Sequence, residues 1–301
     1  MSAVSVRAHA KINLDLRVLG TRPDGYHELR TVFQALALHD VVTCADRPGD
    51  FRIECDTPGV PLDASNLVFK AAQRLWTALG RPGEPRDTVL RIEKHIPMQA
   101  GLGGGSADAA ATLLALARLW KADITPAALA EVGGAIGADV PFFLAGGTAL
   151  GLGRGDEIYP LVDLPRHWVV LLTPAFGVST QDAYGWYDGD RAAGTLAHPE
   201  PQFVPGPWPS RAAQMVNDLE PPIAQRHPEI ARMRAALLAA GAAAASMSGS
   251  GSTVFGLFQR KVEATRAVAR FTAEGWKACR TWSLGRADYA ASTRPRLVRG
   301  I

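Results

Sequence analysis

The feature that most constrains this chain is a glycine-rich loop at residues 97–105, which runs directly into an alanine-rich segment. Its glycines allow the backbone to turn tightly and to approach a bound anion closely. The unpaired N–H groups in the first turn of a following helix would then point at that anion. The loop therefore predicts a phosphate site that needs no charged side chain.

The residues on either side of the loop support this interpretation. Residues 89–94 alternate like a strand, and Leu113, Leu116 and Trp120 recur at helical spacing. The pattern thus predicts strand, loop and helix, which is the context of a phosphate-binding loop. The alternative is a flexible connection, but so many adjacent glycines would be entropically costly if nothing used their backbone.

Two common nucleotide motifs are excluded at this loop. A Walker A sequence requires Gly-Lys-Ser/Thr after the glycines, and none follows here. A dinucleotide fingerprint that starts at Gly101 would require glycine at position 106, where the chain has Ser106. The loop belongs to another class of phosphate site.

Size and charge narrow the class of protein. With 301 residues and 47% hydrophobic content, the chain can form a soluble globular protein, and we expect two domains. The net charge of +3 is small and the sequence has no long basic run, so nucleic acid is not an expected partner. Small anionic ligands fit this composition better, and the sequence indicates no oligomeric state.

The sequence also predicts a cytoplasmic protein without a membrane segment. Its 3 cysteines form no C-x-x-C pair, and no secretory signal precedes the first charged residues. Residues 235–258 lack charge, but the small polar residues in their middle would be costly in a bilayer. We expect helix, glycine loop and strand there.

Local patterns predict further elements along the chain. Residues 3–20 alternate as a strand and lead into a Pro-Asp-Gly turn. Asn66 opens an amphipathic helix, and Thr125 followed by Pro126 resembles a capped helix start. Residues 188–211 have little periodicity, so we expect a long loop or an insertion.

Several motifs together resemble the GHMP small-molecule kinases. The first comprises Ala10-Lys11-Ile12-Asn13-Leu14 and Arg22-Pro23-Asp24-Gly25-Tyr26-His27, and the second is the loop at 97–110. The remaining motifs are Gly137-Ala138-Asp139-Val140-Pro141-Phe142-Phe143, Asn217-Asp218-Leu219-Glu220 and Ser248-Gly249-Ser250-Gly251-Ser252. The resemblance covers nearly the whole chain, and the first and third motifs resemble the branch that acts on diphosphocytidyl methylerythritol.

The resemblance implies both a fold and a reaction. The fold is α/β (α+β), with a ribosomal-S5-domain-2-like ATP-binding domain over residues 1–160 and a ferredoxin-like C-terminal domain over 161–301. The reaction transfers the γ-phosphoryl of ATP to the 2-hydroxyl of the diphosphocytidyl substrate in the non-mevalonate route. Mg²⁺ is implied with ATP, but no Asp/Glu cluster in the sequence identifies a protein ligand.

Asp139 and Lys11 are the predicted catalytic residues. Phosphoryl transfer to an alcohol needs a proton acceptor, and the resemblance assigns that role to Asp139. Lys11 lies on an otherwise apolar strand, where a cation needs an anionic partner, and Asp139 is the natural one. The alternatives are a helix-capping carboxylate for Asp139 and a lysine snorkelling from a strand edge.

The resemblance also assigns binding residues. The ATP set comprises Asn66, Leu67, Lys94, Pro97, Met98, Gln99, Ala100, Gly101, Leu102, Gly103, Gly104, Gly105, Ser106 and Ala107. The substrate set comprises Asn13, Tyr26, His27, Thr180, Tyr184, Gly249, Ser250 and Gly251. Tyr26 would stack on cytosine and His27 would hydrogen-bond it, while residues 178–180 and Tyr184 would form the opposite wall.

Each binding assignment has a structural alternative. Asn66 could be only a helix cap, and Lys94 could be a solvated charge. Tyr26 and Tyr184 could be core or surface aromatics, and the loop at 249–251 could be a plain β-turn. Two other functions also stay open: a GHMP kinase acting on a sugar, homoserine or a mevalonate-like alcohol, and a nucleotide-binding module without turnover.

Overall fold

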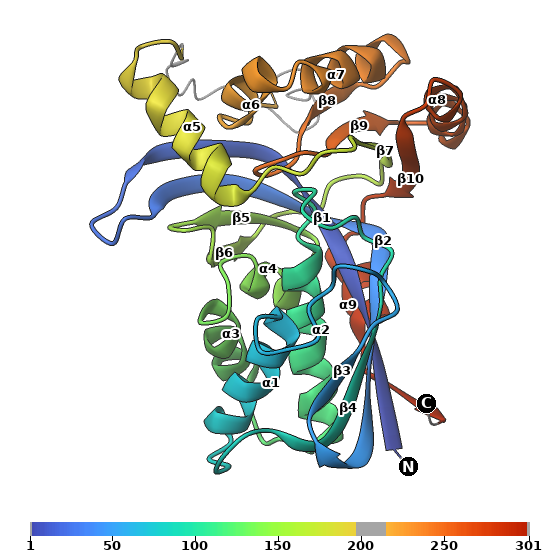
Figure 1. Ribbon diagram of the computed structural model, residues 1–301. Coiled ribbons are helices and arrows are strands. Elements are labelled where there is room, and N and C mark those ends of the chain that lie inside the picture. The colour runs from blue at the N-terminus through green and yellow to red at the C-terminus, as the bar shows by residue number, and fades with distance from the viewer. Residues whose placement is uncertain (1, 197–214, 300–301) are drawn as a thin grey trace.

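The computed structural model describes residues 2–196 and 215–299 (Figure 1). Two long antiparallel strands, β1 (Ser2–Thr21) and β2 (His27–Asp50), run the length of the molecule and connect its two halves. A tight turn joins them, with Gly25 at φ +82°. The strand expected at residues 3–20 and the Pro-Asp-Gly turn are both confirmed.

The first sheet is built around β1 and β2. Its main order is β11-β1-β2-β4-β3. In addition, β5 pairs with the N-terminal part of β2, at residues 31–34, and with β6. All pairings are antiparallel except that of β3 with β4. The added strands are β3 (Arg52–Glu54), β4 (Arg86–Glu93), β5 (Thr148–Leu152), β6 (Glu157–Pro160) and β11 (Arg296–Arg299).

Helices pack on this sheet and form the first hydrophobic core. The central one is α2 (Gly104–Leu119), most of whose alanines and leucines are buried against β1, β2 and α1. Small alanine side chains allow the helix to lie close to the sheet. The other helices of this half are α1 (Leu67–Ala78), α3 (Pro126–Gly134), α4 (Val140–Ala145) and α9 (Arg286–Thr293).

A second sheet of four strands packs against the middle and the C-terminal part of β1, in the upper part of Figure 1. Its order is β10-β7-β9-β8, and all its pairings are antiparallel. The strands are β7 (Trp168–Thr173), β8 (Ala244–Met247), β9 (Val254–Phe258) and β10 (Lys277–Trp282). The helices are α5 (Thr180–Ala192), α6 (Glu220–Arg226), α7 (Glu229–Ala239) and α8 (Lys261–Ala273).

The middle of β1 is buried on both faces. Ala10, Ile12 and Leu14 pack against the second sheet in a shared hydrophobic cluster. Since successive side chains of a strand point to opposite faces, Lys11 and Asn13 emerge on the other side. The strand thus places two polar side chains in an interior position between the two halves of the molecule.

Two expectations from the sequence are wrong in part. Residues 188–192 are helical because α5 continues to Ala192; residues 197–211 of the same segment lie outside the described residues. Residues 235–258 contain an extra strand, β8, between the helix and the glycine loop. That strand was missed because Ala244, Ala245 and Ser246 carry no β-branched or aromatic signal.

Other local predictions are confirmed. Asn66 and Thr125 cap α1 and α3 through their side chains, and Pro126 occupies the first turn of α3. No helix among the described residues is long and apolar enough to span a bilayer. The boundary at residues 160/161 stays a prediction, and the structure adds that β11, near the C-terminus, pairs with β1.

Candidate active site

The predicted phosphate loop leads from β4 into α2 as expected. Gly103 occupies the N-cap position of α2 at φ +71°, and no side chain caps the helix. A Cβ on Gly103 would lie 2.6 Å from Cζ of Phe143 and 3.1 Å from Cε of Lys11. Glycine is therefore required here both for its backbone angle and for its close contacts. The uncapped first turn of α2 can receive an anion.

The carbonyl groups of the loop are held by neighbouring segments. Leu102 O accepts from Lys11 N at 3.0 Å, and Ala100 O accepts from Thr253 N at 3.2 Å. The side chains of Ala100, Leu102 and Ala107 are buried, so they cannot reach a ligand. Any contact of these three residues with nucleotide would have to come from their backbone.

Lys11 and Asp139 meet beside this loop. Nζ of Lys11 lies 3.3 Å from Oδ2 of Asp139 and donates to Oδ1 of Asn13 at 2.7 Å. Lys11 is only 4% exposed, so a snorkelling lysine is excluded. Asn13 is held in turn by Thr31, to whose Oγ1 it donates at 2.7 Å. The chain of polar contacts orients the ammonium toward the carboxylate.

Asp139 does not act as a helix cap. It occupies the N-cap position of α4, but its side chain makes no capping hydrogen bond. Its side chain is 32% exposed, whereas that of Lys11 is almost completely covered. The carboxylate is therefore accessible to a ligand while it stays paired with a buried cation.

The second glycine loop packs directly on the first. Ser248 Oγ donates to Gly101 O at 2.9 Å, and a Cβ on Gly101 would lie 2.0 Å from Ser248 O. A Cβ on Gly249 would lie 3.2 Å from Nζ of Lys11. The loop includes a β-turn, closed by a bond from Gly251 N to Ser248 O at 2.9 Å. The β-turn is thus confirmed and lies beside Lys11, and substrate contact by residues 249–251 stays a prediction.

Asn217 supports the second glycine loop, a role that its sequence motif did not predict. Its Nδ2 donates to the carbonyls of Met247 and Gly249, both at 2.8 Å, and thereby fixes the second glycine loop. Glu220 supports the same loop by accepting from Met247 N at 2.8 Å. The Asn-Asp-Leu-Glu motif at 217–220 indicated that Asn217 is functionally relevant. Its hydrogen-bond partners could not be predicted without the fold.

Lys94 is a buried ion-pair residue, so the alternative of a solvated lysine is wrong. Its ammonium donates to Asp108 at 2.7 Å and also contacts Asp40. Asp40 additionally accepts from the backbone N–H groups of His95 and Ile96, at the entrance of the phosphate loop. This cluster joins β2, the start of the loop and α2.

Burial and charge shift the pKa values in this cluster. Burial lowers the pKa of Lys94, but the carboxylates of Asp108 and Asp40 outweigh it, and the net shift is upward. Burial raises the pKa of Asp108 to about 8, opposed by Lys94. Oδ1 of Asp108 has no hydrogen-bond partner among the described residues. The ammonium of Lys94 already contacts Asp40 and Asp108. The predicted contact of Lys94 with nucleotide stays a prediction.

Of the two residues predicted near adenine, Leu67 lies beside the loop and Asn66 caps α1. Leu67 Cδ1 is 3.6 Å from the position of a Cβ on Gly105, so Leu67 borders the first turn of α2. Asn66 accepts from Val68 N at 3.1 Å and donates to Pro61 O at 2.6 Å. The capping role of Asn66 is confirmed, and adenine binding by both residues stays a prediction.

Two of the three aromatic residues predicted to meet the substrate are in contact. The rings of His27 and Tyr184 stack at 4.5 Å, and Nε2 of His27 lies 2.9 Å from Asp188. Burial raises the pKa of Tyr184, and the charge of Asp139 adds to that shift. Tyr184 therefore packs on His27, while Tyr26 is 57% exposed at the hairpin tip.

The remaining predicted residues lie around the same loops. Thr180 Oγ1 and Ser250 Oγ are 3.2 Å apart, which brings the start of α5 to the second glycine loop. Met98 is exposed, and Gln99 has a left-handed backbone at φ +51°. Gln99 packs near Gly177, whose Cβ position is 3.1 Å from Oε1 of Gln99. Pro97 and Ser106 are half-buried at the two ends of the loop.

Comparisons with known proteins agree with this geometry. Residues 66–147 match the model of the GHMP kinases N terminal domain, and residues 208–277 match the GHMP kinases C terminal model. A 4-diphosphocytidyl-2-C-methyl-D-erythritol kinase of Moorella thermoacetica is 41% identical over 275 residues, which cover 90% of this chain and 95% of the relative. The protein of the same name from Solibacter usitatus is 43% identical over 87% of this chain and 84% of its own length.

Solved structures give the same result. A crystal structure of 4-(cytidine 5'-diphospho)-2C-methyl-D-erythritol kinase matches with a TM-score of 0.73 and 34% identity, over 93% of this chain and all of the other. A homoserine kinase from Cytophaga hutchinsonii matches with a TM-score of 0.68 but 19% identity, over 98% of this chain and 97% of its own, and shows the fold alone. The fold and the site thus define an ATP-dependent small-molecule kinase of the GHMP type. Within that class, the chain belongs to the 4-diphosphocytidyl-2-C-methyl-D-erythritol kinase family.

Proposed function

We propose that this protein transfers the γ-phosphoryl group of ATP to the 2-hydroxyl of 4-diphosphocytidyl-2-C-methyl-D-erythritol, giving ADP and the 2-phosphate. The named relatives at about 40% identity support this substrate, in the non-mevalonate route to isopentenyl diphosphate. The observation that carries the chemistry is the Lys11–Asp139 pair at 3.3 Å, beside an uncapped helix N-terminus.

Asp139 is proposed to accept the proton of the 2-hydroxyl. The hydroxyl oxygen then forms a bond to the γ-phosphorus, and the bond from that phosphorus to the bridging oxygen of ADP breaks. Asp139 suits this role because it is accessible and makes no capping bond. Its proton returns to solvent after the product leaves.

Lys11 is proposed to hold the reacting groups in register. Its buried ammonium contacts both Asp139 and Asn13, so its position is determined from two sides. A fixed cation beside the attacking oxygen lowers the cost of the negative charge that develops there. Because the site excludes bulk water around Lys11, this stabilisation is larger than it would be at the surface.

The phosphates of ATP are proposed to lie at the first turn of α2. The backbone there is glycine-rich and uncapped, and a Cβ on Gly103 would fill the space between Lys11 and Phe143. Mg²⁺ would arrive with ATP and neutralise charge on its phosphates. Within residues 2–196 and 215–299, no three His, Cys, Asp or Glu side chains gather closely enough to hold a metal ion, so we assign no metal-binding residue.

The cytidyl end of the substrate is proposed to reach Tyr26, His27 and Tyr184. The stacked His27–Tyr184 pair and the exposed ring of Tyr26 support an aromatic site for a pyrimidine. Asn13, Thr180 and residues 249–251 are proposed to contact the rest of the substrate, since Asn13 and Gly249 lie beside Lys11 and Thr180 lies beside Ser250. We also propose that the protein acts in the cytoplasm.

ADP release by the purified protein with Mg-ATP tests this function. The assay compares the cytidyl substrate with the same alcohol without its cytidyl group, with mevalonate and with homoserine. We expect turnover only with the cytidyl compound. Turnover with another alcohol instead would refute the substrate, and ATP binding without any turnover would refute the kinase activity.

A further inference from the structure

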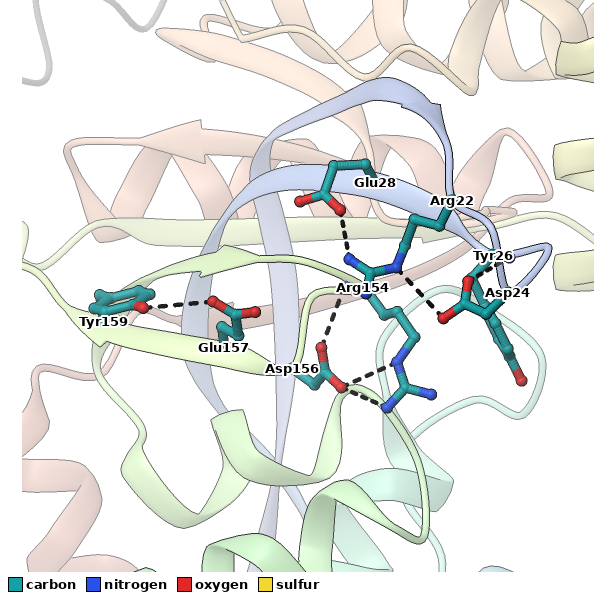
Figure 2. A network of polar contacts seen from close by, with 8 residues as sticks. All are labelled: Arg22, Asp24, Tyr26, Glu28, Arg154, Asp156, Glu157 and Tyr159. Atoms are coloured by element: carbon teal, nitrogen blue, oxygen red, sulfur yellow. Dashed lines mark hydrogen bonds and ion pairs between the residues drawn. The ribbon is translucent and has the colours of Figure 1, made fainter.

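The turn between β5 and β6 packs against the tip of the β1–β2 hairpin, and Figure 2 shows the side chains involved. The two segments are joined by a hydrogen bond from Leu29 N to Gly153 O at 2.7 Å. The guanidinium carbon of Arg154 lies over the ring of Tyr26, 5.3 Å from its centre. A residue from the distant turn therefore covers one face of an exposed aromatic ring.

Asp156 holds Arg154 in this position. Its Oδ2 accepts from Nε of Arg154 at 3.1 Å and from Nη2 at 2.5 Å, and its Oδ1 accepts from Arg154 N at 3.2 Å (Figure 2). Such paired contacts restrain the plane of a guanidinium group. Arginine is suited to this contact because a planar cation can stack on an aromatic face, whereas a lysine ammonium cannot.

The backbone of Tyr26 is restrained separately from its ring. Tyr26 N donates to Asp24 at 3.1 Å, and Arg22 pairs with both Glu28 and Asp24 at the base of the turn (Figure 2). These bonds fix where the side chain begins, but they do not fix how its ring is oriented. At 57% exposure, Tyr26 has little other packing to select one rotamer.

We propose that Arg154, held by Asp156, is a positioning residue for substrate specificity. It orients the ring of Tyr26 so that the uncovered face can stack on the pyrimidine of the substrate. The proposal rests on the proposed function and adds to it two residues, Arg154 and Asp156, that lie outside the phosphate and catalytic loops. Ordering the ring in the free enzyme lowers the entropy that substrate binding would otherwise cost.

The variant R154M tests this proposal, because methionine keeps much of the length but removes the cation. An exposed cation–π contact corresponds to about a two- to fivefold change in binding. We expect KM for the cytidyl substrate to rise by about that factor, with kcat and KM for ATP unchanged. D156N should also raise KM for the cytidyl substrate, since it weakens the hydrogen bonds that restrain the Arg154 guanidinium.

The matched control is R166M. Arg166 is exposed and, like Arg154, lies over aromatic rings, 5.0 Å from the centre of Trp168 and 4.9 Å from that of Trp282, on the second sheet. We expect its kinetic constants to equal those of the wild type. Thermal unfolding of all variants shows whether a change in KM reflects misfolding.

A double-mutant cycle with Y26A separates positioning from direct contact. If Arg154 acts through Tyr26, R154M has no further effect on KM in the Y26A background. If Arg154 instead contacts the diphosphate of the substrate, its effect persists there, and binding of cytidine alone is unchanged by R154M. The proposal is overturned if R154M still raises KM in the Y26A background, if R154M leaves the binding of cytidine unchanged, or if R154M leaves KM for the cytidyl substrate unchanged. Failure of the proposed function is distinguishable, because the wild type itself would then not turn over the cytidyl substrate.

Discussion

The ammonium of Lys11 lies 3.3 Å from the carboxylate of Asp139, although the two residues come from the first strand and from the N-cap of α4. Gly103 lies against both Lys11 and Phe143, so three motifs that are distant in sequence meet around one glycine. The pair is asymmetric, with a buried cation and an accessible anion. That asymmetry suits a carboxylate that exchanges protons with a substrate while its partner stays fixed.

Replacing Asp139 by asparagine should abolish most of the activity. Asn has nearly the same shape but cannot accept the proton, so we expect kcat to fall by about 10²–10⁴-fold, with KM for ATP close to that of the wild type. Steady-state ADP release measures both constants. Asp46→Asn, which changes an exposed carboxylate of β2, should leave kcat unchanged. Wild-type turnover in the Asp139 variant would contradict the assignment.

Replacing Gly103 by alanine should weaken both the fold and ATP binding. A side chain at φ +71° is strained, and its Cβ would lie 2.6 Å from Phe143. We expect the free energy of unfolding to fall by about 1–3 kcal/mol and KM for ATP to rise. Gly105→Ala is the control for stability alone, since its Cβ would meet only Leu67, at 3.6 Å. Equal unfolding midpoints for the two variants would refute the steric argument.

Replacing Lys94 by methionine should strongly destabilise the protein. The change leaves Asp40 and Asp108 buried side by side without their cation, and breaking a buried ion pair costs about 3–5 kcal/mol. Chemical denaturation measures this loss. Lys70→Met, at an exposed position of α1, should change the free energy of unfolding by no more than about 0.5 kcal/mol. If both variants lose equally little, the cluster does not stabilise the fold.

His9 should make stability depend on pH. Burial lowers the pKa of His9 from 6.5 to about 4, and the charge of His39 adds to the shift. Its Nδ1 contacts Leu36 O, so Nδ1 carries the proton of the neutral ring, and Nε2 can accept from Ser292. As pH falls, the unfolded chain takes up a second proton on the His9 ring at a higher pH than the folded protein does. The folded state therefore loses stability between about pH 6.5 and 4.

The variant His9→Gln isolates this contribution from that of the carboxylates, which also titrate in acid. A shift from 6.5 to about 4 corresponds to roughly 3 kcal/mol at most. We expect the free energy of unfolding of the wild type to fall more steeply than that of the variant as pH drops from 6.5 to 4. Parallel pH profiles would show that His9 does not carry the dependence.

Much of the local structure could be predicted from the sequence. The glycines at 101–105, the alternation at 89–94 and the caps at Asn66 and Thr125 all depend on near neighbours, and the structure has the expected turns, strand and helices there. β8 and the end of α5 were missed because their small residues and glycines carry weak local signals. Local physics therefore predicts elements where the side chains themselves prefer one backbone geometry.

Apart from the Lys11–Asp139 pair, the partners of buried charges could not be predicted in the same way. Lys94 stands among strand and loop residues, and nothing near it in sequence indicates that Asp40, 54 residues away, is its partner. Likewise, the Asn-Asp-Leu-Glu motif drew attention to Asn217, but only the fold shows that it holds the carbonyls of Met247 and Gly249. Burial decides these roles, because a buried polar group must find a partner wherever the chain places one.

By itself, the sequence determined which backbone could cradle a phosphate and which residue types could carry out proton transfer, because glycine freedom and side-chain chemistry are local properties. Only the tertiary structure decided that Lys94 pairs with Asp40 and Asp108, that the two glycine loops pack together, and that Arg154 covers Tyr26. The packing of the two glycine loops depends on the crossing of β1 between two sheets, which brings distant segments within hydrogen-bond distance. A short-range pattern carries no information about that crossing.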